Sequence, residues 1–279
     1  MSRMPRRHRN IVFILCFACA GLLLGCLPDE EPALDAAVVK HDLLVLARAR
    51  VLFAHQSVGR NILEGVHELS MRTGVPVRIE ALGESNASGP GLFHVLIGRN
   101  ADPDGKLRDF AALLSDRDAS RYDVAMIKFC YEDFGRDSRA APGFAGRYLE
   151  QIQQLQSRRP DVLLVHSTAP LRADPPGWRP RIDRLLARRS GEDEDQLARN
   201  AYNDVLRASP ASVRLFDLAE VEATLPDGSR SSFTLDGRRI DTLWSGYSSD
   251  GAHLNEAGRT RAAAAFVHAL ASALEPATP

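Results

Sequence analysis

The sequence predicts an α/β domain built on one parallel sheet that helices cover on both faces. Short apolar runs typical of buried strands alternate with amphipathic stretches typical of helices along most of the chain. Residues 124–129 form a near-continuous apolar run, as expected for a strand covered on both faces. The 279 residues, 44% hydrophobic and 25% charged, suffice for one large domain, and we find no internal repeat or second linker. A single doubly wound sheet is therefore expected.

The expected elements follow one another from residue 51 onwards. Each expected strand is a short apolar run, at residues 51–54, 75–82, 124–129, 162–165 and 213–218. Each expected helix has apolar positions at helical spacing, at residues 61–72, 106–114, 144–156, 196–207 and 256–274. Gly74 ends the first helix, Pro160 precedes the fourth strand, and residues 83–91 form a Gly-, Pro- and Asn-rich loop. The runs at 51–54, 124–129 and 162–165 are expected to be adjacent at the centre of the sheet.

The first 25 residues have the pattern of an export signal. Four arginines within residues 3–9 precede an apolar run at 11–25, which is shorter than the roughly 20 residues that a membrane-spanning helix needs. The run ends in Leu-Leu-Gly-Cys at residues 23–26, which resembles the lipobox of bacterial lipoproteins, where the cysteine receives a diacylglyceryl group before cleavage. A plain secretory signal or an uncleaved anchor is the alternative interpretation.

The chain therefore divides into a signal peptide (1–25), a tether (26–40) and a domain (41–279). Residues 27–33 are acidic and contain prolines, as suits a short tether. Only Cys130 remains in the domain once the signal has left and Cys26 is lipidated, so no intramolecular disulfide is expected. Leu27 is not the Asp associated with inner-membrane retention, so we expect a lipid anchor at the outer membrane of the cell envelope, facing the periplasm.

Charge and metal-ligand spacing limit the possible partners. Lys plus Arg number 35 against 36 Asp plus Glu, so the chain has no excess positive charge to attract nucleic acid. His94 and His166 could join a metal site with aspartates, but no two ligands have a zinc-motif spacing, so we expect no metal and no cofactor. The Arg-rich stretch at 179–189 is interpreted as a solvated helix face.

Ser57 is the first candidate for catalysis. It follows the first expected strand in His55-Gln56-Ser57-Val58-Gly59, and ligands of parallel sheets bind at the carboxyl ends of the strands. A serine at such a strand-to-helix turn presents its hydroxyl above the sheet, where backbone N–H groups of the helix start can stabilise an oxyanion. The alternative is that Ser57 only caps the helix.

His253 and Asp250 are the second candidates. They lie three residues apart, just before the C-terminal helix. A histidine serves as general base when a nearby carboxylate fixes its tautomer and supports the imidazolium. As an alternative, Asp250 caps the last helix and His253 is a surface residue.

Together these features resemble the SGNH, or GDSL, hydrolase superfamily over residues 51–274. Further similarities are Asn203 before the fifth strand, the strand end Phe216-Asp217-Leu218, and Gly258 after His-Leu-Asn. The resemblance implies a flavodoxin-like sheet and a triad of Ser57, His253 and Asp250. It also implies an oxyanion hole of a backbone N–H, a Gly and an Asn, and hydrolysis or transfer of small esters.

Two motifs depart from the pattern of that superfamily. The usual Gly-Asp-Ser is His-Gln-Ser at residues 55–57, and the usual Gly-x-Asn-Asp is Cys-Tyr-Glu-Asp at residues 130–133. Because an ionised Glu132 cannot donate a hydrogen bond, other groups must bind the oxyanion. Gly98 and Asn100 are expected in this role, with Lys128 or Tyr131 as further donors, although Asn100 can also be read as a turn residue.

Two other polar side chains follow strands. Cys130 is read as a small buried hydrophobe. His166 ends the fourth expected strand and is expected to line the substrate pocket.

The expected function is a cell-envelope serine esterase that removes short acyl groups such as acetyl, with an envelope polysaccharide or another small ester as substrate. Three alternatives remain open. An O-acyltransferase would use the same triad, a glycan-binding lipoprotein would have lost turnover, and an α/β-hydrolase would place Ser57 in a Gly-x-Ser-x-Gly elbow. The last is disfavoured because Ser57 follows the first strand, and His55 replaces the first glycine.

Overall fold

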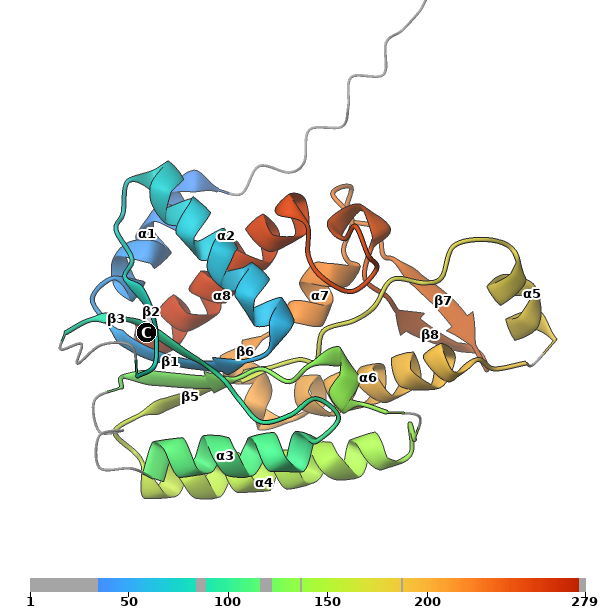
Figure 1. The fold of residues 1–279 in the computed structure, drawn as a ribbon, viewed down its shortest axis with the longest axis horizontal. Coiled ribbons are helices and arrows are strands. Elements are labelled where there is room, and N and C mark those ends of the chain that lie inside the picture. Colours follow the sequence, from blue (N-terminus) through green and yellow to red (C-terminus); the bar gives the residue numbers. More distant parts are fainter. Residues whose placement is uncertain (1–34, 84–88, 116–121, 136, 187, 276–279) are drawn as a thin grey trace, which may run out of the picture. The chain divides into compact units, whose positions relative to one another are not determined.

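A six-stranded parallel sheet forms the centre of the structure, a computed structural model that describes residues 35–275 apart from 84–88, 116–121, 136 and 187 (Figure 1). The strands lie in the order β2-β3-β1-β4-β5-β6, and all of their pairings are parallel. Without the short edge strand β2, this is the flavodoxin-like order. The predicted fold class is confirmed. The strands are β1 Arg50–His55, β2 Ile79–Ala81, β3 Gly91–Leu96, β4 Val124–Ile127, β5 Leu163–Ser167 and β6 Leu215–Phe216.

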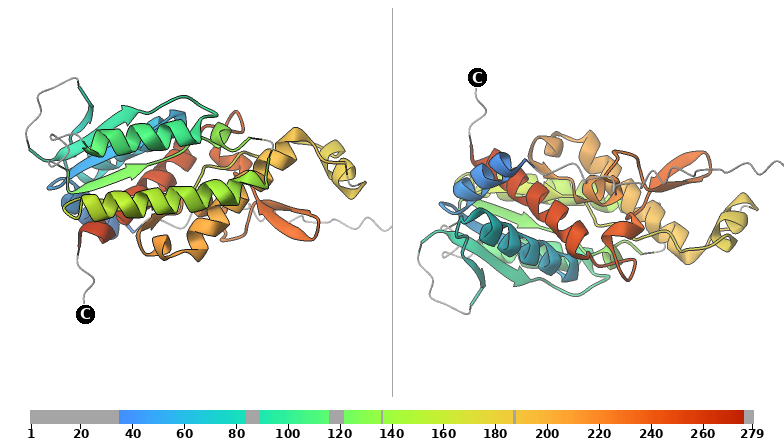
Figure 2. Two further views of the ribbon diagram at one scale, coloured as in Figure 1. Left: turned by 90° about the horizontal axis from the view of Figure 1, so that it is seen from below. Right: turned by 90° about the horizontal axis from the view of Figure 1, so that it is seen from above.

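Helices cover both faces of this sheet. Figure 2 shows α2 and α8 over one face and α3 and α4 over the other. The first layer consists of α1 Ala36–Leu46, α2 Ser57–Thr73, α7 Leu218–Ala223 and α8 Glu256–Leu274. The second layer consists of α3 Pro103–Ser115, α4 Ala140–Arg158 and α6 Gly191–Ala208. Beyond the carboxyl ends of the strands lie α5 Arg179–Leu185 and an antiparallel hairpin of β7 Ser232–Leu235 and β8 Arg238–Asp241 (Figure 1). Three 3₁₀ turns complete the described elements, η2 Tyr131–Asp133, η3 Pro210–Arg214 and η4 Ser245–Tyr247.

Strand β1 explains why the central strands are apolar throughout. Val51 and Phe53 belong to the core beneath α2 and α8, whereas Leu52 and Ala54 belong to the core beneath α3 and α4. The Phe53 ring packs on Phe266 of α8 with centroids 4.8 Å apart. Because successive side chains enter opposite cores, neither face tolerates polar residues. The predicted central order is also confirmed, since β1 pairs with β4 and β4 pairs with β5.

The contact between α2 and α8 depends on small residues. A Cβ at Gly65 of α2 would lie 2.4 Å from the carbonyl oxygen of Arg259 and 2.8 Å from the Cβ of Ala263. Ala262 and Ala263 on α8 are fully buried. The two helices therefore approach closely, and their separation is set by backbone atoms that cannot move aside.

The structure differs from the sequence expectation in several places. The fifth expected strand, 213–218, shortens to β6, because η3 extends to Arg214 and α7 begins at Leu218. The second expected strand, 75–82, shortens to the edge strand β2, while the strand that pairs with β1 is β3, which the sequence did not predict. Helix α1 was also missed. It buries Val39, Leu43 and Leu46 against the α8 layer, so the folded unit begins before the expected tether boundary at residue 40. The β7–β8 hairpin is likewise absent from the sequence expectation. Its turn contains Asp236 and Gly237, both with positive φ, and an Asp-Gly pair is a hairpin signal that could have predicted it.

Residues Glu31–Pro279 form one compact unit, which contains the whole sheet and both cores. Within the described part of the chain, no helix is both long and apolar enough to span a membrane. The predicted signal peptide and Cys26 lie outside the described residues.

Gly65→Ala tests the close approach of α2 and α8. The added methyl meets the Arg259 carbonyl, so overpacking outweighs the helix propensity of alanine, and we expect the free energy of unfolding to fall by about 1–3 kcal/mol. Gly146→Ala on α4 is the matched control, because no atom lies within 4 Å of its new Cβ. There we expect an unchanged or slightly higher unfolding free energy in urea titrations. Equal effects of the two substitutions would contradict the packing argument.

Candidate active site

Ser57 is the first residue of α2, directly beyond the carboxyl end of β1. Gln56, not Ser57, is the N-cap, so the capping alternative does not describe this helix. Ser57 is half-buried, and within the described residues its hydroxyl has no hydrogen-bond partner. The N–H of Gly59 donates to the Gln56 carbonyl oxygen at 2.8 Å, which leaves the N–H groups of Ser57 and Val58 at the start of α2 beside this hydroxyl.

Asp250 and His253 form a hydrogen-bonded pair. Asp250 Oδ2 lies 2.7 Å from His253 Nδ1, and Asp250 Oδ1 accepts from the backbone N–H groups of Ala252 at 2.8 Å and His253 at 2.7 Å. These bonds, with the His253 N–H first among them, hold the pKa of the Asp250 carboxyl well below its usual range. The ionised carboxylate accepts from Nδ1–H, which leaves Nε2 as the basic nitrogen of a neutral ring.

The loop that carries this pair is tied to the start of α2. Leu254 N donates to Asn61 Oδ1 at 3.2 Å, and Asn61 lies one helical turn after Ser57. Ser248 Oγ donates to the His253 carbonyl oxygen at 2.6 Å, which fixes the loop from the other side. No hydrogen bond joins Ser57 to His253 in the part of the chain that the structure describes. Such bonds are often long without substrate and tighten in the Michaelis complex.

Gln56 connects the start of α2 to the loop that follows β3. Its Nε2 donates to the carbonyl oxygens of Ile97 at 2.5 Å and Gly98 at 3.1 Å, so it anchors the loop that follows β3 to the start of α2. Gly98 adopts φ +54, and a Cβ there would lie 2.7 Å from Lys106 Cγ. Only glycine fits this position.

Asn100 lies in the same loop, and both ends of its amide are engaged. Its Oδ1 accepts from Lys106 Nζ at 3.1 Å, and its Nδ2 donates to Glu132 Oε2 at 3.0 Å. An amide nitrogen carries two hydrogens, so one remains for a ligand. Glu132, which cannot itself donate when ionised, orients the amide that can.

A buried ion pair fixes this loop against η2. Lys106 Nζ donates to both oxygens of Asp133 at 2.8 and 2.7 Å, and both side chains are fully buried. Asp133 also accepts from the N–H groups of Ala101 at 3.0 Å and Cys130 at 2.7 Å. Such bonds are what a buried ion pair needs to offset its desolvation.

The Tyr131 side chain lies beside His253. Its ring meets the His253 ring edge-on with centroids 6.0 Å apart, and the Arg172 guanidinium lies 5.4 Å from the Tyr131 centroid. The buried Arg199 donates to the Tyr131 carbonyl oxygen at 3.1 Å. Arg172 and Arg199 both contact Glu192 of α6. No sequence pattern predicts a role for these two arginines, because their contacts with Tyr131 join segments far apart along the chain.

Lys128 is not placed where a ligand can reach it. It is fully buried beyond the end of β4, and its Nζ donates to the Phe129 carbonyl oxygen at 2.9 Å. Burial lowers its pKa to about 8. Contrary to the sequence expectation, Lys128 is therefore not in a position to donate to an oxyanion. Side chains alternate along the strand, and that of Lys128 enters the interior.

His55 is also buried, beneath the first turn of α2. Its Nδ1 lies 2.8 Å from the Gln56 carbonyl oxygen and its Nε2 lies 3.2 Å from His94 Nδ1. A Cβ at Gly59 would lie 2.4 Å from His55, so the glycine after the serine lets the helix rest on this ring. Burial lowers the pKa of His55 to about 3 and keeps the ring neutral.

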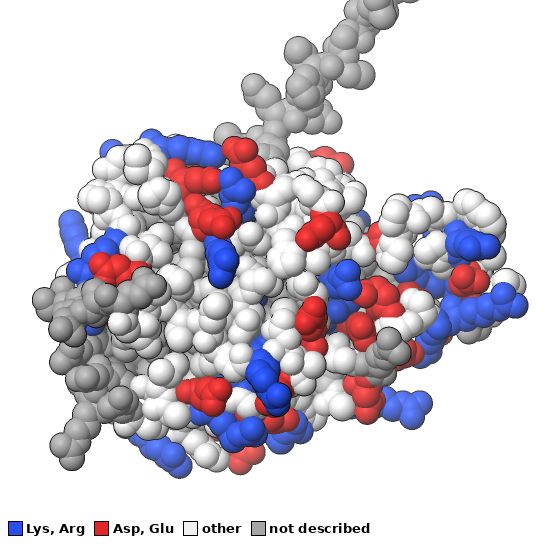
Figure 3. Space-filling model, viewed as in Figure 1, with Lys and Arg blue, Asp and Glu red and all other residues white. Residues whose placement is uncertain are grey.

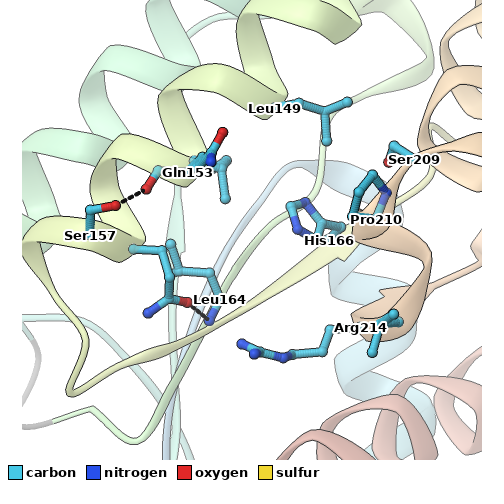
Figure 4. A pocket seen from close by; sticks show the side chains of 11 residues that line it. Leu149, Gln153, Ser157, Leu164, His166, Ser209, Pro210 and Arg214 are labelled. Atoms are coloured by element: carbon cyan, nitrogen blue, oxygen red, sulfur yellow. Dashed lines mark hydrogen bonds between the residues drawn. The ribbon is translucent and has the colours of Figure 1, made fainter.

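His166 lines a different cavity from the expected one. Its side chain points to α4, where Tyr148 Oη lies 3.0 Å from Nδ1. His166 lines a cavity of about 520 Å³, whose lining does not include Ser57, Asp250 or His253. Figure 4 shows it there with Leu149, Gln153 and Arg214. The orientation follows from the alternation of side chains along β5.

The remaining polar candidates carry no site of their own. Cys130 is a buried free cysteine, in agreement with its reading as a small hydrophobe. Across the described residues, no three His, Cys, Asp or Glu side chains are placed to hold a metal ion.

The two buried histidines predict how stability depends on pH. Burial and the nearby Arg214 lower the pKa of His166 to about 4, whereas an unfolded histidine titrates near 6.5. Below pH 6.5 the unfolded chain therefore binds protons that the folded chain does not, and stability is lost as the pH falls towards 4. We expect the melting temperature to drop over this range, and to drop less steeply in His166→Gln, which can still accept from Tyr148. An unchanged slope in the variant would contradict this origin.

Comparison with known proteins gives matches among solved structures alone. No family model matches the chain, and no curated protein matches it. The chain is similar to a protein from Bacteroides fragilis named as an acylhydrolase, with 14% identity and a TM-score of 0.47 over 85% of this chain and 95% of that one. It is also similar to a GDSL-like lipase from Bacteroides thetaiotaomicron, with 11% identity and a TM-score of 0.44 over 83% of this chain and 95% of that one.

All these identities and TM-scores are low, so the function is inferred from the geometry of the chain itself. The order of the strands comes from the structure of this chain and does not depend on those matches. On that order, the chain has the flavodoxin-like α/β sheet that its sequence resemblance to the SGNH, or GDSL, hydrolases implies.

Proposed function

We propose that the protein is a serine esterase in which Ser57 is the nucleophile, His253 the general base and Asp250 the residue that orients the base. The observation that carries the proposal is the Asp250–His253 hydrogen bond of 2.7 Å, in a loop that Asn61 ties to the first turn of α2. This bond joins Asn61 and Leu254, which are 193 positions apart in the chain. It supports a site at the carboxyl end of β1, where parallel α/β sheets bind ligands.

The proposed reaction follows the logic of a catalytic triad. Ser57 Oγ attacks the ester carbonyl carbon while His253 Nε2 takes the hydroxyl proton, and Asp250 stabilises the imidazolium that forms. Nε2 then returns the proton to the leaving alkoxide as the ester bond breaks. Water attacks the acyl-enzyme with Nε2 as base, and Ser57 and a carboxylic acid are released.

The oxyanion of the tetrahedral intermediate would be bound by three groups. These are the N–H groups at the start of α2, the backbone of Gly98, and the free amide hydrogen of Asn100. The hydrogen bonds of Gln56 and Lys106 hold the last two in place before the substrate arrives, so little reorganisation accompanies the reaction.

As substrate we propose a short acyl ester, such as acetyl, on a glycan. Polar and aromatic side chains surround the base, with the Tyr131 ring and the Arg172 guanidinium next to His253. Such groups suit a polar, ring-shaped alcohol portion better than a long acyl chain.

Substitution of the triad residues tests this proposal. Ser57→Ala and His253→Ala should each remove most hydrolysis of an aryl acetate, with the double variant no worse than either alone, because a triad acts as a unit. Asp250→Asn should lose less if the backbone partly holds the His253 loop. The measurements are kcat/KM and labelling of Ser57 by a serine-directed phosphonate.

Lys128→Met is the control, since the buried Lys128 does not reach the site. Circular dichroism confirms that each variant folds. Wild-type turnover in Ser57→Ala would refute the proposal and favour a glycan-binding protein without turnover. Assay with and without a glycan acceptor separates hydrolysis from acyl transfer.

We also propose that Cys26 carries a lipid anchor that holds the domain at the cell envelope, on the outer membrane and facing the periplasm. The support is the sequence pattern of residues 3–26. We expect the wild-type protein to enter the detergent phase on phase separation. Cys26→Ser should lose lipid labelling and either leave the precursor uncleaved or release a soluble domain. Labelling that persists in Cys26→Ser would overturn the assignment.

A further inference from the structure

Helix α5 exposes an unusual concentration of large apolar side chains. Ten large hydrophobic residues are exposed in the described part of the chain, and four of them lie within the nine residues from 178 to 186. Trp178 is 68% exposed, Ile182 43%, Leu185 85% and Leu186 58%, and α5 buries none of its residues. Single exposed hydrophobes are ordinary, but a cluster marks an interaction surface.

The four side chains belong to one face of the helix. Trp178 is the N-cap and Leu186 the C-cap, and the four positions follow the spacing i, i+4, i+7 and i+8. With 3.6 residues per turn, these positions form a single stripe. We call Trp178, Ile182, Leu185 and Leu186 the apolar stripe of α5.

The opposite side of α5 is fixed to the body of the protein. The Arg184 guanidinium donates to Asp193 Oδ1 at 2.7 Å and to Asp174 Oδ1 at 2.5 Å, and it lies 3.6 Å from the centroid of the Phe233 ring. The Arg184 and Asp193 side chains are 7% and 4% exposed. Since this anchor holds the inner side, the apolar stripe is directed outward and is not free to fold back.

Two arginines border the apolar stripe. On the helical spacing, Arg179 lies on one edge of the stripe and Arg181 on the other. Both are exposed, and neither has an ion-pair partner among the described residues. Figure 3 shows blue basic side chains beside uncoloured ones over the α5 region at the right. An apolar stripe with Trp and Leu, bordered by arginines, has the chemistry of a helix that lies in the interface of an anionic bilayer.

We propose that α5 docks on a membrane that contains anionic lipids, with its apolar stripe in the headgroup region and Arg179 and Arg181 on lipid phosphates. The loop that leads from β5 to α5 contains Arg172, which lies over the Tyr131 ring beside His253. Docking through α5 therefore brings the end of the sheet at which α2 begins towards the membrane surface (Figure 1). This surface is independent of the proposed ester hydrolysis and goes beyond it.

Vesicle binding of the unit Glu31–Pro279 tests the proposal without the N-terminal apolar run. That unit contains the whole sheet and both cores, so we expect it to fold without the preceding residues, which circular dichroism checks. The protein should cosediment with vesicles of phosphatidylcholine mixed with phosphatidylglycerol and only weakly with vesicles of pure phosphatidylcholine. Added salt should weaken the binding to the anionic vesicles. Brominated lipids should quench the fluorescence of Trp178. The same measurement on Trp178→Phe gives the contribution of Trp244, the other tryptophan.

Matched substitutions assign the binding to the apolar stripe and its arginines. Leu185→Ser should weaken vesicle partitioning by about tenfold, because one buried leucine is lost from the bilayer. Val213→Ser is the control, since Val213 is 84% exposed on η3, away from α5. Arg179→Glu with Arg181→Glu should abolish the preference for phosphatidylglycerol, and Arg214→Glu should not.

The outcomes separate this proposal from the esterase proposal. Hydrolysis of a soluble aryl acetate should be unchanged in Leu185→Ser, so a loss of vesicle binding alone supports the docking surface. Absence of wild-type binding to anionic vesicles, or equal binding by Leu185→Ser, overturns it. Self-association that Leu185→Ser abolishes, measured by sedimentation velocity without lipid, would also overturn it and assign the apolar stripe to a second copy of the chain.

Discussion

The buried ion pair of Lys106 and Asp133 is the contact on which the candidate site depends. Asp133 collects hydrogen bonds from Lys106, from Ala101 in the loop after β3 and from Cys130 after β4, so three segments of the sheet edge meet on one carboxylate. Loss of one partner would leave a buried charge without compensation, at a cost of about 3–5 kcal/mol. The same lysine holds the Asn100 amide. The pair thus orders loops that an apolar contact would leave less specifically placed.

The distance between Ser57 and His253 depends on helix packing rather than on either motif alone. Ser57 opens α2, and the His253 loop leads directly into α8, so the two catalytic candidates lie at the ends of the helices that pack at Gly65. The bond from Leu254 to Asn61 closes this arrangement. A change in the approach of α2 and α8 therefore moves Ser57 relative to His253, although Gly65 itself is two turns from the site.

The residues by which both motifs depart from the common pattern make specific hydrogen bonds of their own. Gln56 donates to the Ile97 and Gly98 carbonyls, and Glu132 accepts from Asn100, so each departure is matched by a partner in the loop after β3. Both departures therefore help to position the loop after β3 beside Ser57 and η2.

The sequence by itself determined the α/β class, the three central strands and the C-terminal helix, because long apolar runs and helical spacing are local signals. It also placed Ser57 at a strand-to-helix turn and paired Asp250 with His253, since both follow from residues near one another in the chain. Only the tertiary structure decided which side Lys128 and His166 face, because a shift of one position in a strand reverses the side chain. Strand β3, helix α1, the roles of Arg172 and Arg199, and the outward stripe of α5 depend on contacts between distant segments, which no local pattern records.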